Sequence, residues 1–395
     1  MNSKKLKIPL VKNTIDKSDI DDLIDWIKTE PRLTKGTVTC ELEKAWSEWL
    51  GVKYSVYVNS GSSANLAAIY SVILSGKMKN NKIIMPAVSW PTTVAPAIQL
   101  GLHPILCDCN LDNLGLDIPH FKELVQNENP AVVMIVPVLG IPSDMEDIVK
   151  ICRENDIILI EDACEAPGSS YDKKKIGTFG DISTFSFYYG HHISTIEGGM
   201  VCTDNEELYH TILSIRSHGW DRDLPKEKRA SLRKENKIQE FRSLYTFYDP
   251  GFNLRSTDLQ AFIGLSQMKK IDEVVRKRKE NYELFSMLIN NSEWSPLLDA
   301  RAEVSNFAFP IITTKIENLV KKLQNSGVEC RPLVCGSIGR QPFWKKLFGE
   351  ISLPNADFVH YNGLYVPNNH QITKDEIEVI CETVNSVINQ KRIEG

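Results

Sequence analysis

The sequence predicts an α/β protein, in which a large domain built on a mostly parallel sheet is followed by a smaller α/β domain. Two features of the chain support this prediction. Short apolar runs alternate with amphipathic stretches along its N-terminal part, and the pattern changes after residue 289. In addition, 395 residues exceed the usual size of one hydrophobic core, so a second domain is expected.

Several runs in the first domain are expected to form strands. They cover 82–88, 103–109, 131–138, 157–163 and 181–189. An amphipathic helix is predicted at 145–155, between the third and fourth of these runs. Apolar runs of this length that are separated by helices are typical of a parallel sheet with both faces covered. Ligands bind such sheets at the carboxyl ends of the strands.

The second domain is predicted to begin within a long helix. A helical period extends over 253–289, and the strand, helix and strand that follow are expected at 306–313, 315–327 and 328–334. Gly327 fits the C-cap of the middle helix, and Thr373 with Glu376 forms a capping-box pattern before the last helix. The predicted domains therefore cover 1–270, including an N-terminal helical segment, and 271–395.

The composition is that of an ordinary globular protein. With 42% hydrophobic and 25% charged residues and a net charge of -5, the chain lacks the basic surplus of nucleic-acid-binding proteins. Its first residues contain no signal-peptide run and no stretch reaches the length of a membrane span, so we expect the cytoplasm. The nine cysteines include no Cys-x-x-Cys pair, which favours free thiols over disulfides. The charged stretch 222–237 is expected to be a solvated loop or helix face.

A candidate anion site lies at the start of a predicted helix. Gly61, Ser62 and Ser63, in the segment GSSAN, stand just before an apolar helical run. Free backbone N–H groups and hydroxyls at a helix N-terminus bind negative charge, because the helix dipole and the unpaired donors both favour it. The alternative is plain helix capping, for which serine is a preferred residue.

Three further residues stand at predicted strand ends. Asp162 ends the run IILIED, where a carboxylate needs a cation or several donors, although it could simply cap the next turn. Glu165 follows three residues later and can lie on the same side of a helical turn. Trp90 follows another strand and offers a face for stacking a planar ring, core packing being the commoner role of tryptophan.

Two adjacent histidines follow the last predicted strand of the sheet, in SFYYGHHISTIEGGM. Neighbouring residues on an extended chain point in opposite directions, so His191 and His192 are not expected to bind one metal ion. Imidazole titrates near neutral pH and is the usual general base of enzymes, while a buried structural histidine is the ordinary alternative.

These segments together resemble the sugar aminotransferase family of DegT/DnrJ/EryC1/StrS type. The family uses pyridoxal phosphate (PLP) on nucleotide-linked keto-sugars and has the fold-type I, aspartate aminotransferase-like fold, with a large mixed, mostly parallel sheet. In its strand-end motif, Ser-Phe is followed by three residues, by the lysine that forms a Schiff base with the cofactor, and by Glu-Gly-Gly six residues later. Ser186 and Glu197 place that lysine position at His191. The resemblance extends from 42–51 to 363–370 and implies a PLP-binding role for the large domain.

The resemblance implies a role for each candidate residue. Gly61, Ser62 and Ser186 would hold the cofactor phosphate, with Ser63 beside them, and Trp90 would stack on the pyridine ring. Asp162 would pair with the protonated ring nitrogen, and Glu165 would lie near the phenolic oxygen of the ring. Asn253, in DPGFNLRSTD, matches a residue that reaches the phosphate of the neighbouring subunit, which implies a homodimer with shared active sites.

The histidine is typical of a subgroup of 3-dehydratases, in which HHIST is followed by EGG. This likeness implies a GDP-linked 4-keto-6-deoxy sugar as substrate, glutamate as amino donor, pyridoxal and pyridoxamine phosphate as cofactor forms, and release of ammonia. His191 would take a proton from the cofactor methylene and pass it to the departing C3 hydroxyl. His218 and Arg331 are candidates for contacts to the sugar or diphosphate, although surface salt bridges explain them equally well. The product would serve surface-polysaccharide assembly.

Four other functions remain open from the sequence. A dehydratase with an iron–sulfur cluster needs closely placed thiolates, and no cysteine lies between Cys202 and Cys330. An ordinary C4 aminotransferase would need a lysine from elsewhere, or a natural lysine at 191. A GDP-4-keto-6-deoxyheptose is an alternative substrate for the same dehydration. A silent binding protein would not need the complete set of cofactor residues.

Overall fold

The structure is a computed structural model that describes residues 8–389. Segments 1–7 and 390–395, which the predicted domains include, lie outside the described residues. No helix within the described part of the chain is long and apolar enough to cross a membrane.

A seven-stranded sheet forms the centre of the N-terminal part. Its strands, in spatial order, are β1 (Tyr54–Val58), β9 (Gly199–Thr203), β8 (Ile182–Ser186), β5 (Ile158–Asp162), β4 (Val132–Ile135), β2 (Lys82–Pro86) and β3 (His103–Cys107). Only β9 runs antiparallel to its neighbours, and the other neighbouring strands pair in parallel. The predicted mixed, mostly parallel sheet is therefore confirmed, and each apolar run expected to form a strand contains one.

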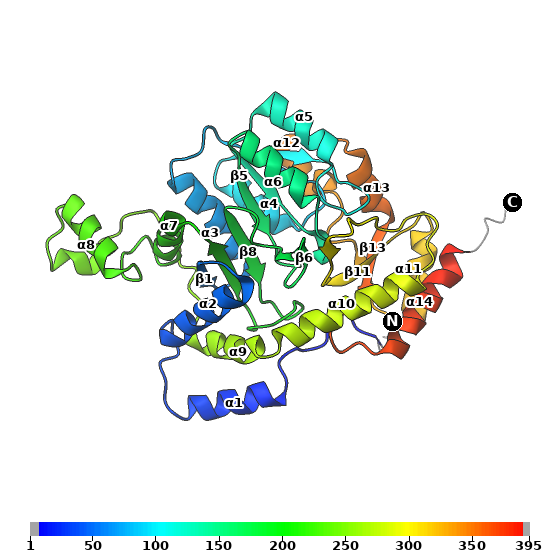
Figure 1. The fold of residues 1–395 in the computed structure, drawn as a ribbon, viewed down its shortest axis with the longest axis horizontal. Helices are drawn as coiled ribbons and strands as arrows, with labels where there is room; N and C mark the ends of the chain where they lie inside the picture. The colour runs from blue at the N-terminus through cyan, green and yellow to red at the C-terminus, as the bar shows by residue number, and fades with distance from the viewer. Residues whose placement is uncertain (1–7, 390–395) are drawn as a thin grey trace.

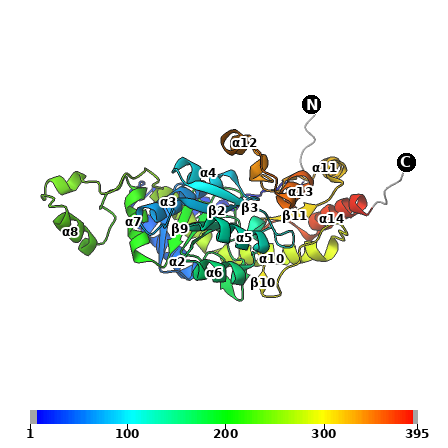
Figure 2. The same cartoon turned by 90° about the horizontal axis from the view of Figure 1, so that it is seen from above.

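Helices cover both faces of this sheet (Figures 1 and 2). On one face lie α3 (Gly61–Leu74), α4 (Pro91–Gln99) and α7 (Glu206–Arg216). On the other lie α2 (Thr37–Leu50), α5 (Ile118–Glu128), α6 (Met145–Glu154) and α9 (Asp258–Met268). Neighbouring residues of a strand enter opposite cores, as Ile83 and Ile84 do, which explains why the strands are apolar at every position.

The C-terminal part has its own core and sheet. The antiparallel strands β11 (Ala308–Ile312), β13 (Gly363–Pro367) and β12 (Arg331–Pro332) pack against α10 (Ile271–Leu288), α11 (Ile316–Asn325) and α14 (Lys374–Ile388). Thr373 and Glu376 form the predicted capping box, and Gly327 follows α11 with a φ of +77°. The strand predicted over 328–334 is wrong in length, because only two of its residues pair with β13.

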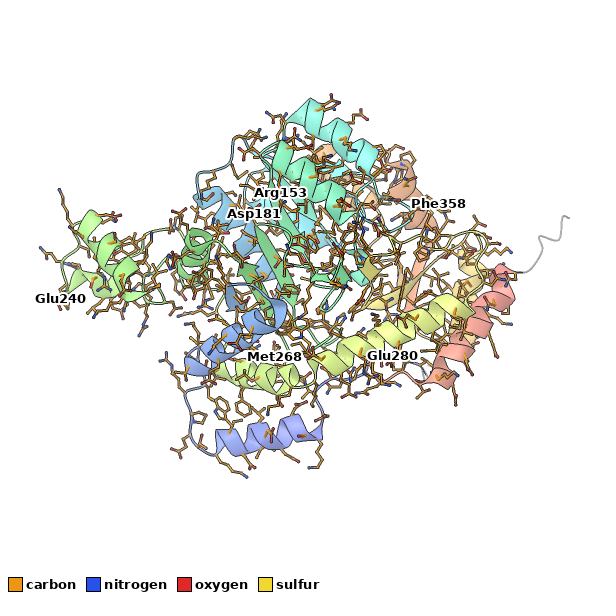
Figure 3. The ribbon with its side chains drawn as sticks, viewed as in Figure 1. Arg153, Asp181, Glu240, Met268, Glu280 and Phe358 are labelled. Atoms are coloured by element: carbon orange, nitrogen blue, oxygen red, sulfur yellow. The ribbon has the colours of Figure 1, made fainter. Side chains whose placement is uncertain are left out.

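The helix predicted over 253–289 is two helices rather than one. Helix α9 ends at Met268, and α10 begins at Ile271 after the cap residue Lys270 (Figure 3 labels Met268 and Glu280 on either side of the break). The proposed domain boundary between 270 and 271 falls at this break. Of the remaining elements, β10 (Ala302–Glu303) pairs with β6 (Ser170–Tyr171), which in turn pairs with β7 (Lys174–Lys175).

Four further helices and three 3-10 turns complete the described part of the chain, and the turn at 138–140 is buried. They are α1 (Lys17–Ile27), α8 (Lys226–Glu235), α12 (Pro342–Phe348), α13 (Pro354–Asn362) and 3-10 turns at 138–140, 242–245 and 338–340. Helix α8 projects from the body of the molecule (Figures 1 and 2) and contains no buried residue. Apart from Leu224, which is buried, and Asp223, which pairs with Arg216, the charged stretch 222–237 is therefore solvated, as predicted.

Candidate active site

The start of α3 packs tightly against the end of β8. Ser60 caps the helix by accepting a hydrogen bond from the backbone N–H of Ser63 at 3.0 Å. A Cβ atom on Gly61 would lie 2.6 Å from Cβ of Ser186, closer than real side chains approach. The absence of a side chain at Gly61 thus brings the unpaired N–H groups of the helix beside the hydroxyl of Ser186.

The hydroxyls of Ser62 and Ser63 do not cap the helix, because Ser60 performs that role. Ser62 is exposed, and its hydroxyl donates to Oγ1 of Thr92 at 3.1 Å, which joins it to the start of α4. Trp90 directly precedes α4 and is 55% exposed. The core-packing alternative for Trp90 is therefore wrong, since its ring is available to a ligand beside the serines.

Asp162 is a buried carboxylate at the carboxyl end of β5. It is 5% exposed, and its Oδ2 accepts hydrogen bonds from Asn65 at 2.8 Å and from Thr93 at 2.7 Å. Oδ1 accepts the backbone N–H of Cys164 at 3.3 Å, and the thiol of Cys164 also interacts with the carboxylate. Within residues 8–389, Asp162 forms no ion pair, so neutral donors alone hold a carboxylate that burial makes costly and that a cation would stabilise.

Glu165 lies in the same turn as Asp162. Its Oε2 accepts the backbone N–H of Leu139 at 2.7 Å, and Leu139 adopts a positive φ of 53° to present it. Burial raises the pKa of Glu165 to about 7, with the Leu139 N–H opposing the rise and Asp162 adding to it. Near neutral pH, Glu165 can therefore accept or donate a hydrogen bond.

His191 lies in the loop between β8 and β9, facing the turn that contains Asp162. Its Nδ1 is buried without a hydrogen-bond partner, and its ring lies 5.1 Å from the ring of Phe307. Burial lowers the pKa of His191 to about 4, Arg278 lowers it further, and the backbone of Cys164 acts in the opposite direction. The imidazole is thus neutral at pH 7 and has a free nitrogen.

His192 points away from His191, as the alternation along the chain predicts. It is fully buried, and its Nε2 lies 3.0 Å from both the carbonyl and the hydroxyl oxygen of Ser305. His192 is therefore the structural histidine of the pair, and His191 is the one that faces the candidate site.

Cys164 connects these groups, although no pattern in the sequence distinguishes it from the other cysteines. Its Sγ would lie 3.2 Å from a Cβ on Gly61, its N–H binds Asp162, and its backbone interacts with His191. The structure therefore brings together every predicted cofactor residue except Asn253. The residues that lie together are Gly61, Ser62, Ser63, Trp90, Asp162, Glu165 and Ser186, with His191 beside them.

Asn253 belongs to a separate, exposed group. It pairs with Ser217, and its Oδ1 accepts from Arg255 at 3.1 Å. His218 joins this group, with its Nε2 lying 3.3 Å from a guanidinium nitrogen of Arg255. Among the described residues, no hydrogen bond or ion pair connects this group to Asp162 or His191.

Arg331 forms a surface salt bridge, which was one of the two roles expected for it from the sequence. It is exposed at the edge of the C-terminal sheet and pairs with Glu329. Its position across from Tyr365 on β13 nevertheless places it on the side of the C-terminal sheet that contacts Phe307.

The donor set matches a flat heterocycle that carries a phosphate and a positive nitrogen. Gly61 lets the hydroxyl of Ser186 lie beside the N–H groups of a helix N-terminus, which suits a phosphate, and an exposed Trp90 offers a stacking face. The carboxylate of Asp162, which has no ion pair within residues 8–389, suits the nitrogen, and the unpaired Nδ1 of His191 suits a proton-carrying group. The residues present therefore fit pyridoxal phosphate.

Sequence reasoning missed several residues of this site. Asn65 orients Asp162 and is itself held by Thr184 at 2.6 Å, and its place one helical turn after Gly61 could have indicated it. Thr93 also donates to Asp162, and its position three residues after Trp90 could have indicated it in the same way. Arg278 and Phe307 come from the C-terminal part, and no local pattern distinguishes them from their neighbours.

Comparisons with known proteins agree with this geometry. Residues 13–385 match the model of the DegT/DnrJ/EryC1/StrS aminotransferase family. The chain is 35% identical over 391 residues to GDP-4-keto-6-deoxy-D-mannose 3-dehydratase from Escherichia coli O55:H7 (strain CB9615 / EPEC), covering 96% of this chain and 100% of that protein. The solved structure of E. coli GDP-4-keto-6-deoxy-D-mannose-3-dehydratase with bound hydrated PLP has a TM-score of 0.88 and 34% identity, covering 96% of this chain and 100% of the other. A structure of GDP-4-keto-6-deoxymannose-3-dehydratase with a trapped PLP-glutamate geminal diamine has a TM-score of 0.87, with the same identity and coverage.

Proposed function

Because the chain belongs to the DegT/DnrJ/EryC1/StrS aminotransferase family, we propose that it is a PLP-dependent 3-dehydratase of a GDP-linked 4-keto-6-deoxy sugar. One observation carries the proposal. His191 occupies the position at which the family carries its lysine, and its Nδ1 is buried and unpaired beside the cofactor residues. An imidazole can move protons but cannot hold the cofactor covalently as a lysine does.

The residues of the site would hold the cofactor by complementary charge and shape. The N–H groups at the start of α3 and the hydroxyls of Ser62, Ser63 and Ser186 would hold its phosphate. Trp90 would cover one face of the ring, and Asp162 would hold the ring nitrogen in its protonated form. When bound, the cofactor supplies an electron sink and a carrier for one amino group.

His191 acts as base and then as acid at its free nitrogen. Its lowered pKa, about 4, leaves the imidazole unprotonated at pH 7, so it can accept a proton as soon as the reactants are in place. The same nitrogen then delivers a proton to the hydroxyl that leaves C3. Phe307 and the backbone of Cys164 hold the ring in place between these steps.

The proposed overall reaction balances in atoms and electrons. Glutamate loses its amino group and two electrons and leaves as 2-oxoglutarate. The sugar loses its C3 hydroxyl, gains hydrogen at C3, and keeps its C4 ketone. The amino group is released as ammonia, so one ammonia and one 2-oxoglutarate accompany each deoxygenated sugar.

A basic cavity supports a nucleotide-linked substrate. It measures about 570 Å³, and its lining includes Arg32, Lys35, Arg222 and Arg255. Lys35 pairs with Asp223, whereas the other three form no ion pair with a carboxylate among the described residues. Arg222 lies 5.0 Å from the ring of Trp220, which also lines the cavity. Unpaired arginines beside an aromatic ring are suited to a diphosphate joined to a planar base, and His218 adjoins them.

The proposal is tested with purified protein, PLP, glutamate and GDP-4-keto-6-deoxymannose. We expect ammonia and 2-oxoglutarate in equal amounts, and a sugar product whose mass shows replacement of one hydroxyl by hydrogen. A product that retains nitrogen, with 2-oxoglutarate but no ammonia, would show a C4 aminotransferase instead. A 4-keto-6-deoxyheptose offered in parallel identifies the preferred sugar.

We also propose that the enzyme is a homodimer that shares its active sites. Asn253 is exposed, and among the described residues no hydrogen bond joins its side chain to the cofactor residues of its own chain, which is compatible with a residue that serves the neighbouring subunit. Uncovered apolar side chains surround the candidate site, at Trp90, Tyr188 and Ile196, each about half exposed. A second subunit would cover them.

Mixing two inactive variants tests the shared site. His191→Asn removes the base, and Asn253→Ala removes the contact that we assign to the partner. If the site is shared, a mixed dimer contains one site with both native residues, so an equal mixture should recover roughly a quarter of the wild-type activity, as random pairing predicts. The two variants should be unfolded and refolded together so that their subunits pair at random. Activity no greater than the mean of the two variants would contradict sharing.

A further inference from the structure

A buried arginine gathers backbone carbonyls directly behind His191. Arg278, on α10, is 2% exposed. Its Nη1 donates to the carbonyl of Phe307 at 2.7 Å, to that of Asn306 at 3.3 Å, and to that of Asn368. Its Nη2 reaches the carbonyl of His191 at 3.5 Å. These acceptors come from loops that enter β11, leave β13 and connect β8 to β9.

The charge of Arg278 has no carboxylate to balance it. Within residues 8–389 it forms no ion pair, and its Nε lacks a hydrogen-bond partner. Arg216 provides the contrast, because this equally buried arginine pairs with both Glu43 and Asp223. A buried cation is costly without a counter-charge, so the arrangement at Arg278 needs a reason other than stability.

The geometry connects Arg278 to His191 in two ways. The guanidinium binds the backbone carbonyl of His191, and it also binds that of Phe307, whose ring lies 5.1 Å from the imidazole. Phe307 is fixed in turn by its N–H, which donates to Leu139 at 2.8 Å. A positive charge held this close disfavours a second positive charge on the imidazole.

We propose that Arg278 is a positioning residue for His191, which fixes the backbone and ring of the histidine and, through its unbalanced charge, keeps the imidazole unprotonated. The inference rests on the proposed function, in which an unprotonated His191 is the base. Under this inference, a residue of the C-terminal part of the chain controls the protonation state of a catalytic group in the N-terminal part.

Other charged or titratable groups also surround His191. They are Asp162 and Glu165 at the end of β5, His192 and Tyr188 in its own loop, and Tyr365 and His370 in the C-terminal domain. Glu165 has its own pKa raised to about 7, and burial with Arg278 lowers the pKa of His370 to about 4. The carboxylates would raise the pKa of His191, whereas its pKa is lowered to about 4 by burial and then by Arg278.

The experiment is an NMR titration of the full-length protein labelled at its eight histidines, with the His191 signal assigned by its loss in His191→Asn. We compare Arg278→Gln, which removes the charge but keeps an amide donor, with Arg278→Lys, which keeps the charge but loses the planar fork. Arg276→Gln is the control, because it removes an exposed charge from the same helix. We expect the pKa of His191 to rise by about one unit or more in Arg278→Gln and to stay low in the other two.

Three results would overturn the inference. They are a wild-type His191 that titrates near the ordinary 6.5, no rise in Arg278→Gln, or an equal rise in Arg278→Lys. The wild-type titration and the lysine variant keep the test decisive if the glutamine variant does not fold.

The titration needs no substrate, so it separates this inference from the proposed function. If no dehydration occurs but the predicted shifts do, the role of Arg278 stands and the reaction is wrong. If dehydration occurs, the acid limb of its pH–rate profile should move to higher pH in Arg278→Gln and not in Arg278→Lys. An unmoved acid limb in the glutamine variant contradicts the inference.

Discussion

Replacing His191 with asparagine is expected to lower the rate of ammonia release by about 10² to 10⁴-fold, the usual contribution of a general acid–base group. Asparagine is of similar size but cannot accept and return a proton near neutral pH. The groups to which we assign cofactor binding, including Gly61, Asp162 and Ser186, do not depend on His191 for their hydrogen bonds. Cofactor binding should therefore persist, as measured by its absorbance in the purified variant.

His192→Asn is the matched control for this prediction. It changes an adjacent, fully buried histidine whose Nε2 contacts Ser305 rather than the candidate site. We expect it to cost about 1–3 kcal/mol of stability through lost hydrogen bonds, with the activity of the folded fraction largely retained. An equal loss of activity in both variants would mean that the loop, rather than the base, had been damaged. His191→Lys should stop ammonia release as well, because lysine is the residue that the aminotransferases of the family carry at this position.

Replacing Asp162 with asparagine is expected to abolish most of the activity through the cofactor. Asparagine keeps an oxygen for the donors Asn65 and Thr93, so the fold should not suffer. It cannot hold a positive ring nitrogen, however, and the loss of one partner from a buried ion pair costs about 3–5 kcal/mol. We therefore expect the affinity for PLP, or the rate with PLP bound, to fall by about 10² to 10⁴-fold.

Thermal unfolding with and without PLP separates these effects. In the wild type, PLP should raise the melting temperature, because a ligand stabilises the state that binds it. Asp162→Asn should melt at or above the wild-type temperature without PLP, since it removes a buried negative charge that has no ion pair, and PLP should raise it much less. A variant that is unstable without PLP would mean that Asp162 serves the fold rather than the cofactor.

Local patterns in the sequence predicted five of the seven described strands of the large sheet, but not β1 or β9, and they singled out most residues of the candidate site. Each strand of the parallel part is an apolar run, because both faces of the sheet are covered, and Asp162 is evident as a charge at the end of such a run. Trp90 was harder to interpret, because an apolar residue after a strand usually enters the core, whereas this ring is 55% exposed. The sequence shows the residue type but not which side of the chain the ring occupies.

The remaining features depend on contacts between distant segments. Arg278 lies in the run RKRKE, where four neighbouring charged residues are solvated or partly so, and only tertiary packing singles it out. The break between α9 and α10 has neither glycine nor proline to indicate it, because Lys269 and Lys270 form the caps. The separation of Asn253 from His191 is also a property of the folded chain and has no signal in either motif.

The pairing of β10 with β6 has a consequence for how ligands enter. This pairing, together with the hydrogen bonds of Ser305 to Ser169 and of Phe307 to Leu139, ties residues 302–307 to the large domain along a continuous seam. Several of these backbone contacts would have to break together before the C-terminal part could move as a hinged lid. We therefore expect the candidate site to be preassembled within each subunit, so that ligands exchange without a hinge motion of this part. An inhibitor designed to wedge the two parts of the chain apart should gain little affinity from doing so.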